Sequence, residues 1–194
     1  MRILSLGWGV QSFTLAAMVA LGELEPVDAA IHSDTLHERS ATYEFARCWT
    51  PWLEARGARV VTVKNPTGGL FEVIKHPGQT HVPAFTLDAG GSRGQLKRSC
   101  THRWKLVPMR RWITTQLAGA RKTPGLVEQW IGISLDEVER MKPGDTKYIV
   151  NRWPLIELRM SRNDCANWLN VHGLEIPQKS SCTFCPFHDR RAWL

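Results

Sequence analysis

Apolar runs and amphipathic segments alternate through the first 65 residues. Residues 2–6 form a short apolar run, and apolar residues then recur at helical spacing over 11–21. A second apolar run covers 27–35 and is followed by a predicted helix over 40–56. A third run, at 58–65, is rich in β-branched residues. This alternation of strand and helix predicts an α/β fold with a doubly wound, mostly parallel, Rossmann-like sheet.

A fourth apolar run, "EQWIGIS" at 128–134, comes much later. Between the third and fourth runs, residues 76–100 are rich in Gly, Pro and polar residues, which is typical of a functional or mobile loop. The residues "SLDE" at 134–137 match a capping box, in which Ser134 caps a helix and Glu137 reaches back.

The C-terminal part of the chain has a different character. "SRND" at 161–164 predicts a helix start, and that helix is expected to end at Gly173. The last 20 or so residues contain a cysteine knuckle and no further βα unit. We therefore expect an α/β nucleotide-binding domain over 1–150 and a helical region with a cysteine site over 151–194, packed on the same domain.

Length and charge limit the class of protein. A chain of 194 residues with 43% hydrophobic residues is long enough for one well-buried domain. No apolar run approaches the roughly 20 residues of a membrane span, so we expect a soluble, cytoplasmic protein without a membrane partner. The net charge of +7 favours an anionic partner such as a nucleotide, sulfate or nucleic acid.

The first strand leads into a glycine loop, "SLGWGVQS" at 5–12. Such a turn into a helix directs backbone N–H groups and the positive end of the helix dipole toward a phosphate or sulfate. Gly7 and Gly9 permit close approach of the anion, and Ser12 adds a hydroxyl donor. The alternative is a tight turn without a ligand. The loop is neither a Walker A motif nor the full dinucleotide fingerprint.

This loop resembles the pyrophosphate loop of the PP-loop (adenine nucleotide alpha hydrolase-like) superfamily, whose pattern is Ser-Gly-Gly-x-Asp-Ser. Gly9, Val10 and Ser12 match the pattern, whereas Gly7, Trp8 and Gln11 replace its first Ser, first Gly and Asp. Similar variants occur among the phosphoadenosine phosphosulfate (PAPS) reductase-like members. The resemblance implies a PP-loop fold that binds ATP or a related adenine nucleotide, with Mg²⁺.

Two more segments resemble that family. "HSDTLHERSATYEF" resembles the Asp-Thr segment after the second strand, and "GISLDEVERMK" resembles the segment after the fourth. For Asp34 and Glu137 the alternatives are a turn and the capping box. The resemblance implies a nucleotide site made of Ser5, Gly7, Trp8, Gly9, Val10, Gln11, Ser12, Asp34, Thr35, Gly132, Ser134, Glu137 and Arg140, with Ser12, Asp34, Asp136 and Lys105 as catalytic residues.

The cysteines indicate a metal site. "CTFCPF" places two thiols at Cys-x-x-Cys spacing, and two more ligands are needed for a tetrahedral site. The predicted ligands are Cys100, Cys165, Cys182 and Cys185, while Cys48, among apolar neighbours, is expected in the core. Spacing alone fits either a structural Zn²⁺ or a [4Fe–4S] cluster.

The family resemblance favours the iron–sulfur cluster. Related sulfur-transfer proteins have a Cys-Thr-x-x-x-Lys-like element, here "CTHRWK", and a late Cys-x-x-Cys that together hold such a cluster. The resemblance also implies that, with three cysteine ligands, the fourth iron position holds a sulfide for transfer. The chain lacks the Glu-Cys-Gly-x-His tail of thioredoxin-dependent PAPS reductases, which disfavours simple sulfonucleotide reduction.

Basic and aromatic residues alternate over 97–111 and into Trp112. Such a strip can bind the phosphates of a tRNA or DNA and stack on its bases. The alternative is a solvated helix face with two buried tryptophans, Trp104 and Trp112. His102 within the strip is a further candidate, as a proton carrier.

Three functions follow from these patterns. The leading hypothesis is an enzyme that adenylates a nucleic acid or metabolite with ATP, after which a sulfur donor displaces AMP. The second is a cluster-bearing oxidoreductase of activated sulfate, which needs an electron donor. The third is a non-catalytic, zinc-stabilised nucleic-acid-binding module, in which the glycine loop is only a turn.

Overall fold

The computed structural model describes residues 1–66, 84–95 and 99–188. A five-stranded sheet with the order β3-β2-β1-β6-β7 forms its centre. All four pairings between neighbouring strands are parallel, as the alternation of strand and helix predicted. The strands are β1 (Arg2–Ser5), β2 (Ala29–Asp34), β3 (Val60–Lys64), β6 (Val127–Ile131) and β7 (Ile149–Arg152).

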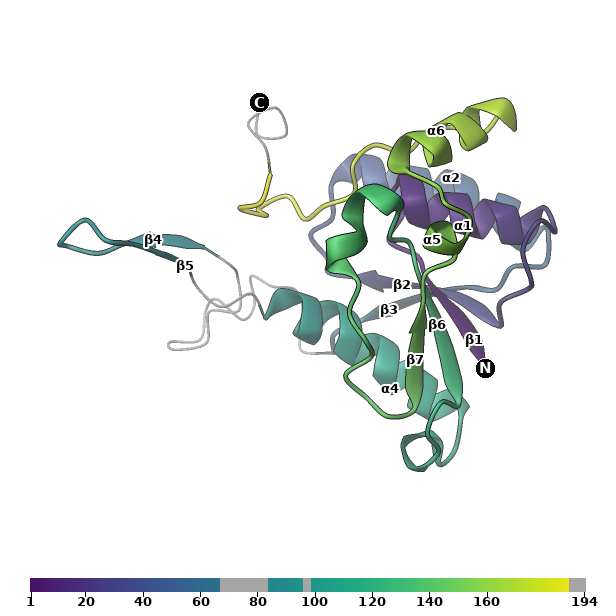
Figure 1. Cartoon of the computed structure of the whole chain (residues 1–194), viewed down its shortest axis with the longest axis horizontal. Helices are drawn as coiled ribbons and strands as arrows, with labels where there is room; N and C mark the ends of the chain where they lie inside the picture. Colours follow the sequence, from purple (N-terminus) through teal and green to yellow (C-terminus); the bar gives the residue numbers. More distant parts are fainter. Residues whose placement is uncertain (67–83, 96–98, 189–194) are drawn as a thin grey trace.

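Helices cover both faces of this sheet (Figure 1). The helices α1 (Val10–Ala20), α2 (Ser40–Glu54), α5 (Pro154–Glu157) and α6 (Arg162–Val171) lie on one face. The other face is covered by α4 (Val107–Gln116), which continues directly from a π-helical turn, η1 (Thr101–Leu106). Two short 3₁₀ segments, η2 (Ala120–Lys122) and η3 (Leu135–Arg140), flank β6.

Alternate residues of β1 contribute to two separate cores. Leu4 belongs to the core under α1, α2, α5 and α6, whereas Ile3 belongs to the core under α4. This follows from the period-two geometry of a strand that is covered on both faces. The first core also buries most of α1, with every residue from Val10 to Met18 buried, so the first turn of this helix is fixed by packing on several sides.

Local predictions had mixed outcomes. The Ser161 capping box with Asp164 is confirmed at the start of α6. The predicted helix over 40–56 is α2, which begins at Ser40 and continues through Pro51 to Glu54. The strand β7 was not predicted, and the expected domain boundary at residue 150 falls inside it.

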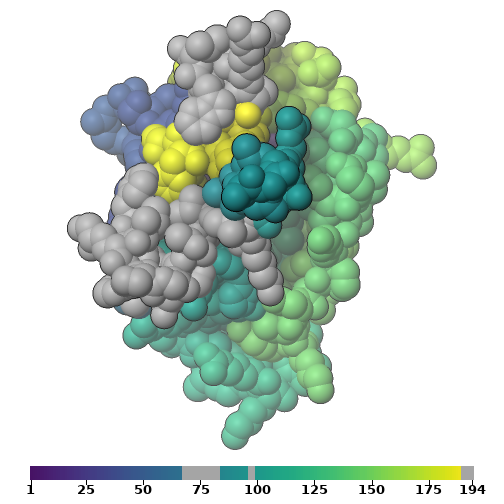
Figure 2. Space-filling model, turned by 90° about the vertical axis from the view of Figure 1, so that its left-hand side faces the viewer, coloured from purple at the N-terminus to yellow at the C-terminus, as the bar shows by residue number. Residues whose placement is uncertain are grey.

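Part of the expected loop over 76–100 is a β-hairpin, made of β4 (Phe85–Leu87) and β5 (Arg93–Gln95). The hairpin projects away from the central sheet (Figure 1). Its Phe85 ring contacts Phe187 of the C-terminal segment at 6.0 Å between centroids, and Figure 2 shows the hairpin and that yellow segment on the same face. Within the described residues, no helix has the length and apolar character required to cross a membrane.

Candidate nucleotide site

A cavity of about 730 Å³ lies where the order of the sheet changes direction, between β1 and β6. Its walls come from the β1–α1 loop, η1 and α4, the segments after β2 and β6, and residues 179–185 near the C-terminus. In doubly wound sheets, ligands bind in the crevice outside the carboxyl ends of the strands at this switch point. The cavity is therefore the candidate site, and the glycine loop lies in its wall.

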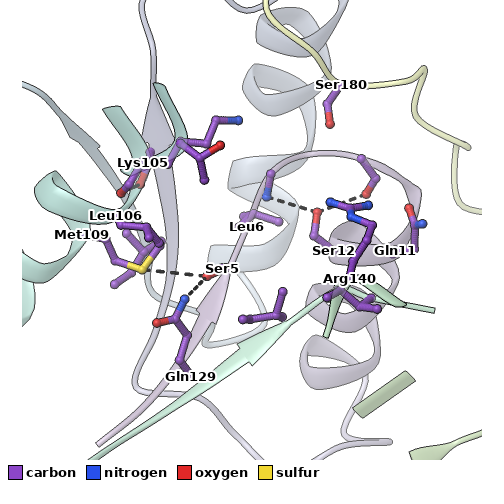
Figure 3. A pocket seen from close by; sticks show the side chains of 18 of the residues that line it. Ser5, Leu6, Gln11, Ser12, Lys105, Leu106, Met109, Gln129, Arg140 and Ser180 are labelled. Atoms are coloured by element: carbon purple, nitrogen blue, oxygen red, sulfur yellow. Dashed lines mark hydrogen bonds between the residues drawn. The ribbon is translucent and has the colours of Figure 1, made fainter. Parts of the chain in front are cut away.

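Ser12 organises the glycine loop. The Gly7 amide donates to Ser12 Oγ at 3.1 Å, and Ser12 Oγ donates to the Gly9 carbonyl at 3.2 Å (Figure 3). Gly9 is the N-cap of α1 and supplies no side-chain cap, and the first turn contains no acidic residue. The amides of this turn have no carbonyl partner within the helix. The start of α1 is thus suited to an anion at the cavity wall.

Trp8 anchors this loop in the core. Its backbone is left-handed, with φ +56°, a conformation that costs a non-glycine residue about 1–2 kcal/mol. Its ring is only 2% exposed and lies edge-on to Phe45 and His32 at 6.2 and 6.5 Å. The sequence placed Trp8 among nucleotide-binding residues, but its side chain does not line the cavity and belongs to the hydrophobic core.

His32 supports the same loop, which the sequence did not suggest. Its Nδ1–H donates to the Leu6 carbonyl at 3.1 Å, at the point where β1 ends. Burial lowers the pKa of this imidazole, so the neutral ring is favoured in the folded protein. The strand end is therefore held by a neutral hydrogen bond directly before the glycines.

Gly132 approaches the loop from β6. A Cβ atom at this position would lie 2.8 Å from the Ser12 amide nitrogen and 3.1 Å from the carbonyl carbon of Gln11. Both are backbone atoms that cannot rotate away. Gly132 also lines the cavity, so the predicted site residue is brought to the loop, where the absence of a side chain lets the two backbones touch.

Gln11 contacts the segment after β6. Its Nε2 donates to Glu137 Oε2 at 3.1 Å and to Ser134 Oγ at 3.3 Å, and the other oxygen of Glu137 pairs with Arg140. Ser134 occupies the N-cap of η3 but makes no capping bond, so the predicted capping box is wrong. The side chains of the predicted pair bind Gln11 instead, and Glu137 and Arg140 line the cavity as expected.

Two predicted catalytic carboxylates lie outside the described lining of the cavity. Asp34 Oδ1 accepts hydrogen bonds from the Leu36 amide and the Tyr43 hydroxyl, both at 2.7 Å, which is the turn role considered from the sequence. Asp136 Oδ1 accepts from the Arg162 amide at 2.8 Å, at the start of α6. The structure therefore assigns both side chains local structural contacts, while Thr35, next to Asp34, does line the cavity.

The described lining is strongly cationic. It contains two carboxylates, and each pairs with an arginine: Glu137 with Arg140, and Asp145 with Arg110. Figure 3 shows Lys105 and Arg140 on opposite sides of the cavity, with Ser180 beyond the glycine loop. This excess of positive charge favours a ligand with several negative charges. The cationic side chains in the lining are Lys105, Arg110, Arg140, Lys142, Arg162 and Lys179.

Three of the predicted metal ligands, Cys100, Cys182 and Cys185, line the same cavity. Backbone contacts fix the knuckle to the segment after β2: the Thr183 amide donates to the His37 carbonyl at 2.8 Å. Cys100, at the start of η1, packs against the buried ring of Trp104. The chain thus brings both cysteine segments to the cavity.

Glu38 lies beside the knuckle and was not singled out from the sequence. Its carboxylate is 2% exposed, and Oε1 lies 3.5 Å from Lys105 Nζ and 3.2 Å from Thr35 Oγ1. The Cys182 thiol points at the same oxygen at 3.8 Å, and burial raises the pKa of that thiol to about 11. A buried carboxylate, a lysine and a thiol therefore meet at this end of the cavity.

Cys165 does not join the other three cysteines. It is fully buried in the core that α1 shares with α6, where its carbonyl accepts from Thr14 Oγ1 at 3.4 Å, and burial raises the pKa of its thiol to about 11. The predicted four-cysteine site therefore does not fit this structure. Among the described residues, no group of three or more His, Cys, Asp or Glu side chains is arranged to hold a metal ion. Cys48, expected in the core, is exposed.

The basic strip is divided by the fold. Lys97 and Arg98 lie outside the described residues. Trp104 is 1% exposed and Trp112 packs against the core under α4, so the two tryptophans have the packing role considered as the alternative. Among the bases, Lys105 and Arg110 line the cavity, whereas His102, Arg103 and Arg111 are exposed.

The fold resembles that of a known enzyme. The crystal structure of phosphoadenylyl-sulfate (PAPS) reductase from Candida auris, in a phosphate complex, superposes with a TM-score of 0.59 over 91% of this chain and 74% of that protein. Sequence identity is 15%, so the similarity is one of fold. No protein-family model matches the chain, and no curated protein matches it by sequence. The predicted PAPS reductase-like PP-loop fold is confirmed.

Proposed function

We propose that the protein is a PP-loop enzyme that binds an adenine nucleotide through loop 7–12 and performs sulfur chemistry at the cysteine end of the same cavity. The observation that supports this most directly is the position of the uncapped start of α1 in the wall of a cavity with six cationic side chains. Amides and cations together are the usual donors for nucleotide phosphates.

The residues around the loop suggest how reaction would be assisted. The amides at the start of α1 would stabilise negative charge that develops on a departing phosphate or pyrophosphate, and Ser12 keeps the loop in the required shape. Arg140, held by Glu137 at the other side, would bind the same group. Lys105 lines the cavity with its Nζ 3.5 Å from Glu38 Oε1, where it can neutralise a substrate anion near the thiols.

For the cofactor we propose Cys100, Cys182 and Cys185 as the ligands, since these three line the cavity and Cys165 does not. Because they are not arranged as a metal site among the described residues, binding would require the two cysteine segments to move closer together. A [4Fe–4S] cluster there would supply sulfide or electrons, whereas Zn²⁺ would supply only structure. Anaerobic purification followed by an absorbance spectrum and metal analysis distinguishes the two. Cys182→Ala should lose the metal, while Cys165→Ala should keep it. Retention of the metal by Cys182→Ala would contradict the ligand set.

The acceptor of the sulfur is proposed to be a nucleic acid or a small metabolite. The exposed bases Arg103 and Arg111 lie on η1 and α4, the elements that also carry the cavity-lining Lys105 and Arg110. A polyanion that approaches this side would meet positive charge before it reaches the thiols.

Nucleotide binding tests the core of this proposal. A variant with Gly9→Val and Ser12→Ala should lose ATP and adenosine 3′,5′-bisphosphate in calorimetric titrations, because a Cβ at Gly9 would lie 2.9 Å from Ser180 Oγ and Ser12 closes the loop. Arg140→Ala should weaken binding about 10- to 150-fold, the value of one hydrogen bond to a charged group. Arg47→Ala, an exposed arginine on α2 outside the cavity lining, is the matched control. Equal affinity in all four proteins would refute the loop assignment.

A further inference from the structure

We infer that the anionic group of the nucleotide binds at loop 7–12 without a divalent cation, and that Gln11 is the residue that determines this. The inference rests on the proposed nucleotide function. It assigns the form of the ligand: a nucleotide free of Mg²⁺, in place of the Mg²⁺ complex of ATP expected from the sequence.

The first step is the supply of metal ligands. Mg²⁺ on a nucleotide is bound by protein carboxylates together with phosphate oxygens and water. Among the described residues that line the cavity, the carboxylates are Glu137 and Asp145, and each forms an ion pair with an arginine. Neither carboxylate is available to a cation unless it leaves that arginine.

The second step is the contact of Gln11 with Glu137. Gln11 is in the first turn of α1 and is 8% exposed, so its side chain has little freedom. Its Nε2 donates to Glu137 Oε2 at 3.1 Å, while Arg140 occupies Oε1. Both oxygens of Glu137 therefore have a donor from the protein. Since an amide is neutral, Gln11 adds no negative charge where the related loop pattern has an aspartate.

The third step is the charge that the ligand meets. The first turn of α1 contains no acidic residue, and its amides carry the positive end of the helix dipole. Six cationic side chains line the cavity. The protein itself thus supplies the positive charge that Mg²⁺ supplies in a carboxylate-rich site. Chelation of ATP by Mg²⁺ removes two negative charges from it, and a cationic cavity should then bind it less tightly.

A substitution of nearly the same shape tests the role of Gln11. Gln11→Glu would place a second carboxylate about 3 Å from Glu137, where the two like charges repel. A divalent cation between them would relieve this repulsion. Gln11→Met removes the same hydrogen bond without adding charge, so it separates the loss of a donor from the gain of a carboxylate.

The experiment is calorimetric titration of the full chain with adenosine 3′,5′-bisphosphate and with ATP, each in EDTA and in excess Mg²⁺. For the wild type we expect bisphosphate affinity in the two buffers to agree within about twofold, and ATP to bind more weakly with Mg²⁺. Gln11→Glu should bind weakly in EDTA and regain at least about tenfold with Mg²⁺, whereas Gln11→Met should show no such recovery.

Other outcomes overturn the inference. Wild-type affinity that rises about tenfold or more with Mg²⁺ would refute metal-independent binding while leaving the proposed nucleotide function intact. A Gln11→Glu protein that ignores Mg²⁺ would refute the role of Gln11. Absence of binding by the folded wild type in both buffers would refute the proposed function, and the inference with it.

Discussion

Gly132→Ala is expected to damage both the stability of the protein and its nucleotide site. The added Cβ would lie 2.8 Å from the Ser12 amide nitrogen, a distance that real Cβ contacts essentially never show, and the atom in the way is backbone. Overpacking of this kind costs about 1–3 kcal/mol. Replacing glycine by alanine recovers about 0.4–1 kcal/mol through the unfolded chain, so the net loss is at most about 2.6 kcal/mol and about 1.3 kcal/mol at the midpoints of the two ranges.

For a chain of 194 residues, the midpoint loss corresponds to a decrease in Tm of roughly 3–5 °C, and the largest loss to about 10 °C. Nucleotide affinity should fall as well, since the shifted Ser12 amide belongs to the turn that we propose binds the anion. The loss of one charged hydrogen bond reduces affinity by at least about tenfold. Differential scanning fluorimetry gives the first quantity and calorimetric titration with adenosine 3′,5′-bisphosphate gives the second.

Gly90→Ala is the matched control for this substitution. A Cβ at Gly90 would meet only Asp88 Oδ1, at 3.4 Å, which is the end of a flexible side chain on the exposed hairpin. Its effect on stability should stay within about 0.5 kcal/mol. If Gly132→Ala behaves like Gly90→Ala in both assays, the close contact between β6 and the glycine loop does not exist in solution.

Three more predictions concern buried groups. Burial lowers the pKa of His32 below the ordinary value of 6.5, so the unfolded chain binds the proton more readily and stability should fall as the pH drops below about 7. His32→Asn should flatten that part of the plot of Tm against pH, and parallel plots for the two proteins would contradict this. Iodoacetamide should label the exposed Cys48 in the native protein and the buried Cys165 only after denaturation, and mass spectrometry of peptides measures both. Labelling of Cys165 in the native protein would contradict its burial in the core. In a double-mutant cycle of urea unfolding, Lys105→Met and Glu38→Gln should show a coupling energy of about 0.5–1.5 kcal/mol, which is modest because the lysine is 42% exposed. Strictly additive effects of the two substitutions on stability would refute the ion pair.

The strands that could be predicted from the sequence are those with a continuous apolar or β-branched run. The runs that became β1, β2, β3 and β6 are apolar and bounded by polar residues, which is the signal that a sheet covered on both faces requires. The edge strand β7 has only two apolar residues, and the hairpin strands are fully exposed, so neither carries that signal.

Within the site, the sequence correctly indicated which residues lie at the cavity where that position depends on the backbone. The glycine loop and Gly132 reach the cavity because their positions follow from the order of strand and turn. Glu38 was missed because its surroundings include Cys182, which is far away in the sequence. The error on Cys165 was avoidable: it lies four residues before Leu169, and both are buried, as one apolar face of α6 requires.

Trp8 joins the glycine loop to the hydrophobic core, and this restricts how the loop can change in evolution. The position needs a residue that tolerates φ +56° and also fills the space of a large buried ring. Glycine meets the first need, relieving about 1–2 kcal/mol of strain, but the loss of a buried aromatic ring costs about 3–5 kcal/mol. A chain that acquires glycine at this position must therefore first enlarge neighbours such as Phe13 or Phe45, so the order in which these substitutions can be accepted is constrained.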